Sequence, residues 1–468
     1  MNYDRLKKPL VLVIFGITGD LAQRKLLPAL YQLAKAHELP EELHIVGVSR
    51  RDVTKDDVYA KLRDFVGESD FDSSIEQLLR DKTDMVQMNL VDPNDYTALL
   101  ERLQVLESNL EDGASRLYYL SIPSQAFTPI IRLLGETGHN APLSGNADAP
   151  RLLIEKPFGY DLVSAKDLIA VLHEHFGEGQ VYRIDHYVAK ETVQNILTFR
   201  FQNPLFESVW NSAHIDHIAV VAYEKIGIEG RANFYEQTGA LRDLIQSHLL
   251  QLLAITTMAK PVQLESDEIH AEKLRLLNAV LPIAADKVAT ATLRGQYVGY
   301  RDEVSNQDSL VETYARLELS IDNDQWRGVP IILETGKALA EKLTEISISF
   351  KQHDDVGFRR NRLTFRIQPK EGITLRLQTK RPGIQNHTDS AEMDFDYAHS
   401  FNERPAEAYE RVIVDAIRGD QTLFASAAEV LRSWEIIEQV LEQWSRGDSG
   451  LIAYEPGSNG PERSSQNG

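Results

Sequence analysis

Short apolar runs alternate with helical patterns along the first third of the chain. Each run is short and uninterrupted, which is typical of a strand buried on both faces. The runs occupy residues 10–15, 44–48, 117–122 and 152–154. Apolar spacing over residues 21–35 predicts a helix directly after the first run. Strand–helix alternation predicts an α/β domain, with a Rossmann-like doubly wound parallel sheet and helices on both faces.

The pattern changes after about residue 182. Apolar and polar positions then alternate with period two, as in strands that bury one face of an antiparallel sheet. Such segments occupy residues 329–334, 345–350, 362–368, 373–379 and 392–397. Helical patterns return between residues 405 and 444. We therefore expect an α+β second domain, with a large, mainly antiparallel sheet packed against helices.

These patterns divide the chain into three parts. With 468 residues the chain is too long for a single ordinary core. We expect a Rossmann-like domain over residues 1–182 and an α+β domain over residues 183–454. Residues 455–468 are mostly Gly, Ser, Asn and Pro with little to bury, so they are expected to form a disordered tail. Residues 141–150 have a similar composition and are interpreted as a loop.

Charge and composition narrow the classes of function. The formal net charge of −20 makes nucleic acid and anionic membranes poor partners, and no apolar run approaches transmembrane length. The chain has no cysteine, which excludes disulfides, thiolate metal sites and cysteine nucleophiles. Metal ligation by histidine and carboxylate alone stays open, but the histidines lack the tight spacing of zinc proteases, so no metal site is predicted.

The N-terminal segment has two interpretations. Lys7 and Lys8, followed by an apolar run to Ile17, resemble a secretory signal. Polar residues follow without a small-residue cleavage pattern, so a first strand is the better interpretation. We therefore expect a cytoplasmic protein.

A glycine turn separates the first predicted strand from the first predicted helix. Its sequence is Gly16-Ile17-Thr18-Gly19-Asp20-Leu21. Glycine there lets the backbone approach the pyrophosphate of a dinucleotide, and the helix N-terminus supplies donors and positive potential. The turn lacks the usual three-glycine fingerprint, and an ordinary strand-to-helix turn is the alternative. Because the turn follows the first strand of an α/β domain, we interpret it as a cofactor-binding turn.

The end of the second predicted strand indicates which cofactor is bound. It carries Ser49-Arg50-Arg51. An enzyme that prefers NAD usually has an acidic residue there for the ribose hydroxyls, whereas arginines with a hydroxyl suit the 2′-phosphate of NADP. We therefore predict NADP, held by Ser49 and Arg50, with NAD as a second choice. The alternative is a solvated loop whose arginines bind no ligand.

The strand predicted at residues 152–154 continues into Glu155-Lys156-Pro157-Phe158-Gly159. Strand ends in this architecture face the ligand crevice. Proline there can form a cis peptide bond that places the preceding lysine, so Lys156 is a candidate ligand-binding residue. The alternative is a strand that simply ends at proline.

The densest group of chemically active side chains lies between Arg183 and Glu191. If a helix begins at Asp185, His186 and Lys190 are four residues apart and share a face. Two cationic or donor groups with Tyr187 beside them make a phosphate pocket. Such a local cluster would let an acidic chain bind an anionic substrate. The alternative is a solvated helix start that Asp185 caps.

The candidate general base is His248, in residues 239–251, which begin a long predicted helix whose flanks are apolar nearly all round, so the helix is expected to be buried. A buried imidazole needs a partner, and Asp185 lacks one within its own turn. An Asp–His pair holds one imidazole tautomer and stabilises its charged form during proton abstraction. The alternative is a core histidine with satisfied hydrogen bonds and no catalytic role.

Together these segments resemble the glucose-6-phosphate dehydrogenase family. The Arg-Ile-Asp-His-Tyr run is highly specific to that family, whereas the glycine turn and the Glu-Lys-Pro run also occur in other sugar dehydrogenases. The matching segments follow the order of the family over nearly the whole chain. They occupy residues 16–21, 155–159, 183–191, 239–251, 328–339 and 408–420.

The resemblance implies an activity and a set of roles. Glucose 6-phosphate would be oxidised to 6-phosphoglucono-1,5-lactone with hydride transfer to NADP⁺, the first step of the pentose phosphate pathway. His248 would be the general base for the C1 hydroxyl and Asp185 its partner. The second domain would bind the substrate and assemble a homodimer or homotetramer. The phosphate ligands would be His186, Tyr187, Lys190 and Lys342, and the sugar ligands Lys156 (also beside the cofactor), Glu224, Asp243 and Lys337.

The chain departs from the family pattern in three segments. Ser247 replaces the usual Asn before the base, Val188-Ala189 replaces Leu-Gly, and residues 294–300 are shortened. These changes affect local hydrogen bonding and loop shape near the cofactor, but remove no charged catalytic group. Because Leu343 follows Lys342, we do not expect the second, structural NADP site that some relatives carry.

Two rival functions stay open at this point. A different NADP-dependent sugar oxidoreductase would share the Glu-Lys-Pro strand end without needing a phosphate pocket. A non-catalytic NADP sensor that regulates a partner is the other alternative, although such proteins often lose the base, and His248 is present here.

Overall fold

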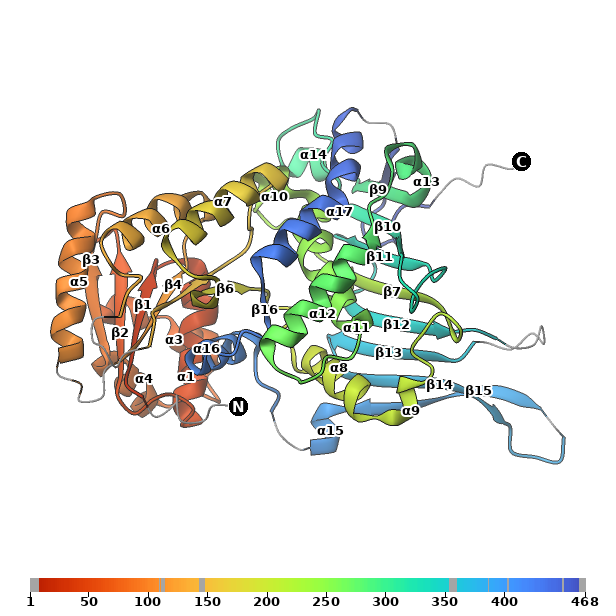
Figure 1. Ribbon diagram of the computed structural model, residues 1–468, viewed down its shortest axis with the longest axis horizontal. Helices are drawn as coiled ribbons and strands as arrows, with labels where there is room; N and C mark the ends of the chain where they lie inside the picture. Colours follow the sequence, from red (N-terminus) through yellow and green to blue (C-terminus); the bar gives the residue numbers. More distant parts are fainter. Residues whose placement is uncertain are drawn as a thin grey trace.

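The molecule is built on two β-sheets, one in each half (Figure 1). The computed structural model describes residues 8–108, 110, 114–142, 148–352, 360–385, 387–401, 404–447 and 450–462. One sheet is almost wholly parallel and the other is mainly antiparallel, which confirms the predicted fold class. Of the loop predicted over residues 141–150, residues 143–147 lie outside the described residues.

The first sheet has the strand order β16-β6-β5-β4-β1-β2-β3. Its neighbouring strands are parallel except at the edge, where β16 pairs antiparallel with β6. Every residue of β1, β4 and β5 is buried, as expected for strands covered on both faces. The strands are β1 (Leu10–Phe15), β2 (Leu43–Ser49), β3 (Thr83–Gln87), β4 (Ser115–Leu120), β5 (Arg151–Ile154), β6 (Val181–Ile184) and β16 (Phe424–Ala425).

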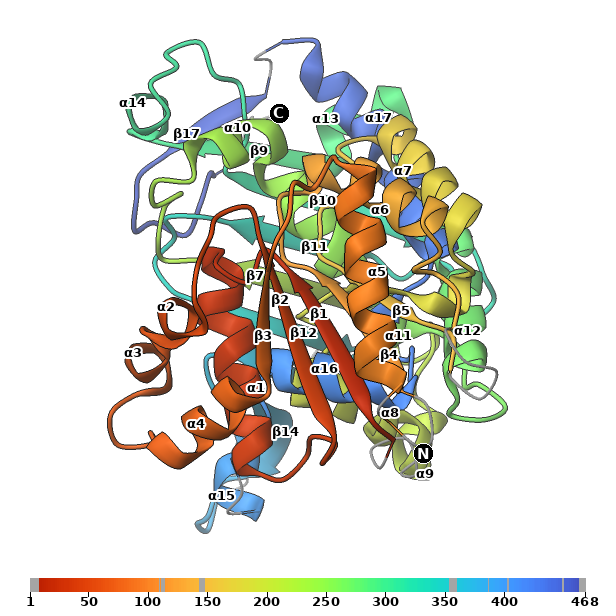
Figure 2. The same ribbon diagram turned by 90° about the vertical axis from the view of Figure 1, so that its left-hand side faces the viewer.

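Helices cover both faces of this sheet. Figures 1 and 2 show α5 and α6 on one face and α1 and α16 on the opposite face. The longer helices are α1 (Leu27–Lys35), α5 (Pro93–Ser108), α6 (Phe127–Glu136), α7 (Leu162–His175) and α16 (Ala408–Arg418). The shorter ones are η2 (Ala22–Leu26), α2 (Lys55–Tyr59), α3 (Leu62–Val66), α4 (Ser73–Asp81), η3 (Ser124–Ala126) and η4 (Glu178–Gln180).

The second sheet has the order β15-β14-β13-β12-β7-β11-β10-β9-β17, and β8 pairs with β10. Its parallel pairs are β7–β11 and β9–β17. The period-two pattern located β13 to the residue, at Arg362–Gln368. The other strands are β7 (Ile215–Tyr223), β8 (Val280–Leu281), β9 (Thr292–Tyr297), β10 (Tyr314–Ile321), β11 (Ile331–Gly336), β12 (Leu343–Phe350), β14 (Gly372–Lys380), β15 (Thr388–Asp396) and β17 (Leu451–Tyr454).

A layer of helices lies between the two sheets, with α8, α11, α12 and α17 prominent in it (Figure 1). The helices of this half are α8 (Glu191–Gln202), α9 (Pro204–Glu207), α10 (Ala232–Ala240), η5 (Leu241–Leu249), α11 (Leu250–Thr257), α12 (Ser266–Ala279), η6 (Ala285–Lys287), α13 (Val288–Ala291), α14 (Tyr300–Glu303), α15 (Tyr397–Phe401) and α17 (Ala427–Ser445). Segment η5 is a π-helix, which has a wider turn than the α-helix expected there.

The expectation of a helix beginning at Asp185 is wrong. Residues 185–190 form turns, and α8 begins at Glu191. The amide of Val188 donates to the carbonyl of Asp185 (3.1 Å), and Lys190 is extended, with ψ 140°. His186 and Lys190 therefore do not share a helical face; the turn places their side chains instead.

The two halves exchange segments along the chain. The expected boundary between residues 182 and 183 falls inside β6, whose edge pairs with β16 from far along the sequence. Helix α16 also returns to the first half, where the guanidinium of Arg151 donates to the carbonyls of Ala416 (2.8 Å) and Ile417 (2.9 Å). The two sheets are thus held together by chain crossings as well as by packing.

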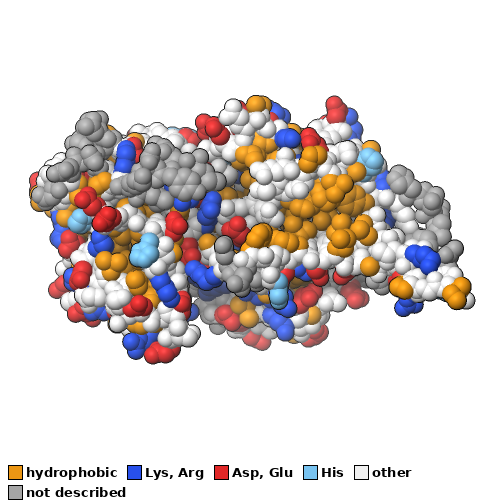
Figure 3. Space-filling view, turned by 90° about the horizontal axis from the view of Figure 1, so that it is seen from below, with side chains coloured by type: hydrophobic (Ala, Val, Ile, Leu, Met, Phe, Trp, Pro, Cys, Tyr) orange, Lys and Arg blue, Asp and Glu red, His pale blue; other side chains and the backbone are white. Residues whose placement is uncertain are grey.

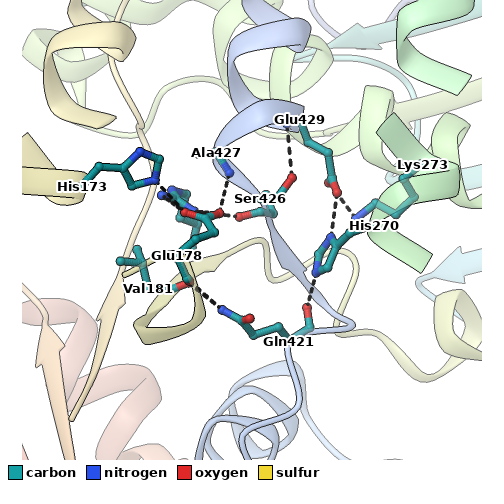
Figure 4. A network of polar contacts seen from close by, with 11 residues as sticks. His173, Glu178, Val181, His270, Lys273, Gln421, Ser426, Ala427 and Glu429 are labelled. Carbon is teal, nitrogen blue, oxygen red and sulfur yellow. Dashed lines mark hydrogen bonds and ion pairs between the residues drawn. The ribbon is translucent and has the colours of Figure 1, made fainter. Parts of the chain in front are cut away.

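A partly buried polar network fixes this junction (Figure 4). The side-chain amide of Gln421 donates to the backbone carbonyl of Glu178 (3.1 Å), and the backbone carbonyl of Gln421 lies 3.0 Å from His270 Nε2. His270 Nδ1 lies 2.7 Å from one oxygen of the fully buried Glu429, and Lys273 lies 2.8 Å from the other. Burial alone would raise the pKa of Glu429, but Lys273 and His270 lower it to about 2. The network joins α12 and α17 to the edge of the first sheet.

The C-terminal segment differs from the expected disordered tail. Residues 455–462 lie beside the loop that follows β11, where the Gly457 amide donates to the Ala338 carbonyl (2.7 Å). Gly460 packs so close to Tyr314 that a Cβ added there would lie 2.7 Å from the ring. Small residues suit this close approach, which composition alone does not distinguish from disorder. Residues 463–468 lie outside the described part of the chain.

Candidate functional site

His248 and Asp185 meet in the buried interior, although 63 residues separate them. His248 Nδ1 lies 2.5 Å from Asp185 Oδ1, and their exposed fractions are 1% and 4%. His248 comes from η5, and Asp185 follows β6 at the end of the first sheet. The amide of Tyr187 also donates to Asp185 Oδ1 (3.0 Å), which fixes the carboxylate within its turn.

Burial and charge set the protonation of this pair. Burial lowers the pKa of His248 below 6.5, although the neighbouring Asp185 opposes the shift. Burial alone would raise the pKa of Asp185, but His248 holds it well below its usual range. At neutral pH the carboxylate is charged and the imidazole is neutral. The Nδ1–H then donates to Asp185, and the Nε2 lone pair can accept a proton.

Two other rings surround the imidazole of His248. The Tyr187 ring stacks on it with 4.2 Å between centroids, and the His186 ring lies 4.8 Å away. Burial lowers the pKa of His186, and the charges of His248, Lys156 and Lys190 lower it further. The Tyr187 hydroxyl accepts a hydrogen bond from Gln368 Nε2 (3.4 Å). The turn at 185–190 therefore brings the expected phosphate ligands His186 and Tyr187 beside the candidate base.

Lys156 and Asp243 form a second pair beside the first. Lys156 Nζ donates to the backbone carbonyl of Asp243 (2.6 Å) and to its Oδ1 (3.1 Å). Burial alone would raise the pKa of Asp243, but Lys156 and Lys337 lower it to about 2. Lys156 follows β5, and its peptide bond to Pro157 is cis. The predicted strand-end lysine thus points to the helix that carries His248.

Lys337 and Glu224 form a third pair, in which Lys337 Nζ contacts Glu224 Oε2. Glu224 follows β7 and Lys337 follows β11. These strands are parallel neighbours, so their carboxyl ends meet at one edge of the second sheet. Lys337 Nζ also lies 5.2 Å from the Tyr235 ring centroid, within the range of a cation–π contact. Each half of the molecule thus contributes carboxylates and lysines to one region.

The other two expected phosphate ligands lie at the ends of elements. Lys190 is half-buried just before α8, and its charge acts on His186. Lys342 is exposed just before β12. Neither ammonium group forms an ion pair with a residue that the structure describes. No hydrogen bond between described residues brings Lys342 to the other expected phosphate ligands.

The glycine turn lies at the carboxyl edge of the first sheet. Gly16 has φ +79°, and a Cβ added there would lie 2.4 Å from the Ser121 carbonyl oxygen. A Cβ at Gly19 would lie 3.0 Å from the Gly16 carbonyl. Both positions therefore favour glycine, because the turn packs closely on itself and against the Ser121 backbone. Thr18 and Leu21 lie in the same turn, which ends in η2, and Asp20 pairs with Arg24 (2.6 Å).

The Ser49–Arg51 segment ends β2, directly beside β1. Ser49 Oγ accepts a hydrogen bond from the Arg51 amide (3.1 Å), and Arg50 and Arg51 are exposed. The carboxyl ends of parallel neighbours share one edge of a sheet. The glycine turn and the two arginines are therefore neighbours, as a dinucleotide site requires.

Sequence reasoning missed a buried cluster behind Lys156. Glu155 Oε1 accepts a hydrogen bond from the Tyr119 hydroxyl (2.5 Å), and burial raises the pKa of Glu155 to about 7. Tyr409, on α16, also acts on this carboxyl group, and its ring lies 6.3 Å from that of His186. The Glu-Lys-Pro run was the available signal, but its spacing does not show which aromatic residues meet Glu155.

Among the described residues, no group of three or more histidine and carboxylate side chains has the arrangement of a metal site. No described helix is long and apolar enough to cross a membrane.

Comparisons with known proteins match both halves of the chain. A family model described as the glucose-6-phosphate dehydrogenase NAD binding domain matches residues 13–195, and its C-terminal domain counterpart matches residues 197–467. Glucose-6-phosphate 1-dehydrogenase of Chlamydia muridarum is 42% identical over 94% of this chain and 91% of its own. Glucose-6-phosphate 1-dehydrogenase 2 of Mycobacterium tuberculosis is 38% identical over 98% and 93%.

Solved structures agree with these matches. A glucose-6-phosphate dehydrogenase in complex with its substrate glucose-6-phosphate has a TM-score of 0.90 at 32% identity, over 98% of this chain and 96% of that chain. The enzyme from Mycobacterium avium has a TM-score of 0.83 at 32% identity, over 97% and 95%. Levoglucosan dehydrogenase, with a TM-score of 0.53 at 9% identity, shares the fold alone. The chain belongs to the glucose-6-phosphate dehydrogenase family.

Proposed function

We propose that the chain oxidises glucose 6-phosphate at C1, with His248 as general base and NADP⁺ as hydride acceptor. Family membership makes the chain an oxidoreductase that uses a pyridine nucleotide. The single observation that carries the proposal is the buried His248–Asp185 contact of 2.5 Å beside a cluster of lysines. The product is 6-phosphoglucono-1,5-lactone, and the reaction opens the pentose phosphate pathway.

The His248–Asp185 pair takes the proton from the C1 hydroxyl. Neutral His248 accepts the C1 hydroxyl proton at Nε2, while Asp185 holds the tautomer through Nδ1 and stabilises the imidazolium that forms. General base catalysis of this kind contributes on the order of 10²–10⁴ in rate. The nicotinamide nucleotide, when bound, supplies the hydride acceptor. The glycine turn and the end of β2 fit such a nucleotide, because they follow neighbouring parallel strands and so lie side by side at the carboxyl edge of the first sheet.

The surrounding charges bind and orient the sugar phosphate. His186, Tyr187, Lys190 and Lys342 would bind the phosphate, and Lys156, Glu224, Asp243 and Lys337 would bind the hydroxyls. A local group of lysines lets a chain of net charge −20 hold a dianion. Phosphate binding remote from C1 also fixes the reacting carbon against the cofactor, which is an orientation effect.

Initial rates test the substrate directly. With NADP⁺ present, kcat/KM for glucose 6-phosphate should exceed that for glucose by at least about 10²-fold, because hydrogen bonds to charged groups contribute about 1.5–3 kcal/mol each. Equal turnover of glucose would favour a different sugar oxidoreductase and remove the phosphate roles of His186 and Lys190. Tight NADP binding without turnover of either sugar would favour a non-catalytic sensor.

Lys190→Ala should raise KM for glucose 6-phosphate about tenfold, while kcat and the KM for NADP⁺ change little. The reason is that the ammonium contributes ground-state binding of the phosphate, remote from the reacting carbon. Steady-state kinetics measure both parameters. Lys166→Ala, at an exposed lysine on α7, is the matched control. An unchanged KM in Lys190→Ala would remove this residue from the phosphate site.

Arg50→Ala should weaken NADP⁺ binding about tenfold or more and leave NAD⁺ binding nearly unchanged. The guanidinium is proposed to contact the 2′-phosphate, which NAD lacks. Fluorescence titration with each cofactor measures both affinities. Arg446→Ala, at an exposed arginine of the other half, controls for the loss of a surface charge. Equal losses for the two cofactors would contradict preference for NADP through Arg50.

We also propose that the protein is a cytoplasmic homodimer or homotetramer. The face shown in Figure 3 carries a patch of hydrophobic side chains in the half of the second sheet. Large apolar residues are exposed on α9, β15 and α15 near that face, namely Leu205 (77%), Met393 (64%) and Phe401 (63%). Exposed apolar patches often mark protein–protein contacts. Light scattering should give twice or four times the mass of 52.9 kDa, and a monomer at micromolar concentration would contradict the assembly.

A further inference from the structure

The C-terminal segment forms a layer over the loop that carries Lys337. The Tyr454 hydroxyl, at the end of β17, donates to the Lys337 carbonyl (2.7 Å). The amide of Gly457 donates to the Ala338 carbonyl (2.7 Å), and the Ala340 amide donates to the Ser458 carbonyl (2.8 Å). Backbone groups at 337, 338 and 340 are therefore held from the C-terminal side.

The loop itself has an unfavourable backbone conformation. Ala338 has φ +52°, a left-handed conformation that non-glycine residues rarely adopt. From the other side, the Ala338 amide donates to the Ile226 carbonyl and the Leu339 amide to the Glu224 carbonyl (2.9 Å each). Such a conformation persists only when its surroundings determine it. The C-terminal segment supplies part of that determination.

Tyr454 is itself held by hydrogen bonds and ring contacts. Its hydroxyl lies 2.8 Å from Thr313 Oγ1, and the Thr313 carbonyl accepts a hydrogen bond from the Lys337 amide (2.9 Å). Its ring packs against Tyr314 and Tyr297, with centroids at 6.0 and 6.4 Å. Both the amide and the carbonyl of Lys337 thus end on one buried unit made by Thr313 and Tyr454.

These backbone contacts determine where the ammonium group of Lys337 lies. Lys337 is 2% exposed, its ammonium contacts Glu224, and its charge lowers the pKa of Asp243. A buried lysine paired with a carboxylate has little room to adjust if its backbone moves. We propose that Tyr454 and residues 455–460 are a positioning unit for Lys337, so that binding of the sugar phosphate depends on the C-terminal segment. This inference rests on the proposed function, in which Lys337 binds a sugar hydroxyl.

Tyr454→Phe tests the unit without removing the ring. KM for glucose 6-phosphate should rise about tenfold, because a buried carbonyl loses its donor and the loop loses its position. KM for NADP⁺ should change less than about twofold. Tyr300→Phe is the matched control, since its buried ring packs in the same cluster but its hydroxyl donates to Glu236 (2.7 Å). A KM for glucose 6-phosphate within about twofold of the unmodified protein would overturn the proposal.

Two shortened chains give a second test. A chain ending at Glu462 keeps all the contacts described above and should keep the KM of the unmodified protein. A chain ending at Glu455 loses the bonds from Gly457 and Ser458 and should show a KM for glucose 6-phosphate raised at least tenfold, with the KM for NADP⁺ nearly unchanged. An unchanged KM, or equal rises for substrate and cofactor, would show a merely structural role. Absence of turnover by the unmodified chain would instead overturn the proposed function, and this inference with it.

Discussion

His248→Asn is expected to lower kcat by about 10³-fold or more, while KM for glucose 6-phosphate changes little. Asparagine is small and polar enough to remain beside Asp185 but cannot take a proton at neutral pH. The phosphate and hydroxyl ligands stay in place, so ground-state binding survives. Single-turnover and steady-state rates of NADPH formation measure the loss.

A second histidine separates catalysis from packing in that experiment. His139 is also fully buried, and its ring nitrogens lie 2.7 Å from the Tyr118 hydroxyl and 2.9 Å from the Tyr96 carbonyl. His139→Asn should reduce stability and leave kcat within about threefold. If His248→Asn behaves like His139→Asn, with kcat preserved within tenfold, His248 is a core residue and not the base.

Asp185→Asn should lower kcat by about 10²–10³-fold with little change of the fold. An asparagine amide can donate to Nδ1, which favours the tautomer that carries its proton on Nε2. That tautomer has no lone pair directed at the substrate, and the imidazolium also loses its counter-charge. Steady-state kinetics with glucose 6-phosphate measure the effect. A variant with more than about half of the normal kcat would show that the 2.5 Å contact has no catalytic role.

The strands and the fold class were predictable because burial leaves a direct mark on sequence. β1 is an uninterrupted apolar run, and it is buried at every position between two parallel neighbours. β13 alternates because one of its faces meets the helix layer and the other does not. These patterns depend on side chains close in sequence, so no knowledge of distant contacts is needed.

The turn at 185–190 was not predictable from the same kind of pattern. Aspartate is a good helix-capping residue, so the local sequence favours a helix that begins at Asp185. Its carboxylate instead binds His248 and the Tyr187 amide. These tertiary contacts determine the backbone conformation of residues 185–190 and override the local preference for a helix. The helix therefore begins only at Glu191, after the residues that make those contacts.

The lysine–carboxylate pairs at the site were not predictable from local sequence patterns either. Lys156 with Asp243, and Lys337 with Glu224, are 87 and 113 residues apart, so no local spacing brings them together. The strand end before Pro157 made Lys156 a candidate, whereas Asp243, Glu224 and Lys337 became candidates only through the resemblance to a family, and the structure adds the contacts. The segment after Tyr454 shows the converse, since its glycines and serines are typical of a disordered tail. At Gly457 and Gly460, with φ +81° and +96°, they instead permit close packing.

The dependence of kcat/KM on pH, compared between the unmodified protein and Asp185→Asn, tests the central claim most directly. The base is active when deprotonated, and the pKa of His248 lies below 6.5, so activity should be full at pH 7 and fall as pH drops through that pKa. Asp185 raises that pKa against the effect of burial, so its loss should move the acid limb to lower pH. A limb that starts above pH 7, or one that does not move in Asp185→Asn, would contradict an Asp185–His248 base.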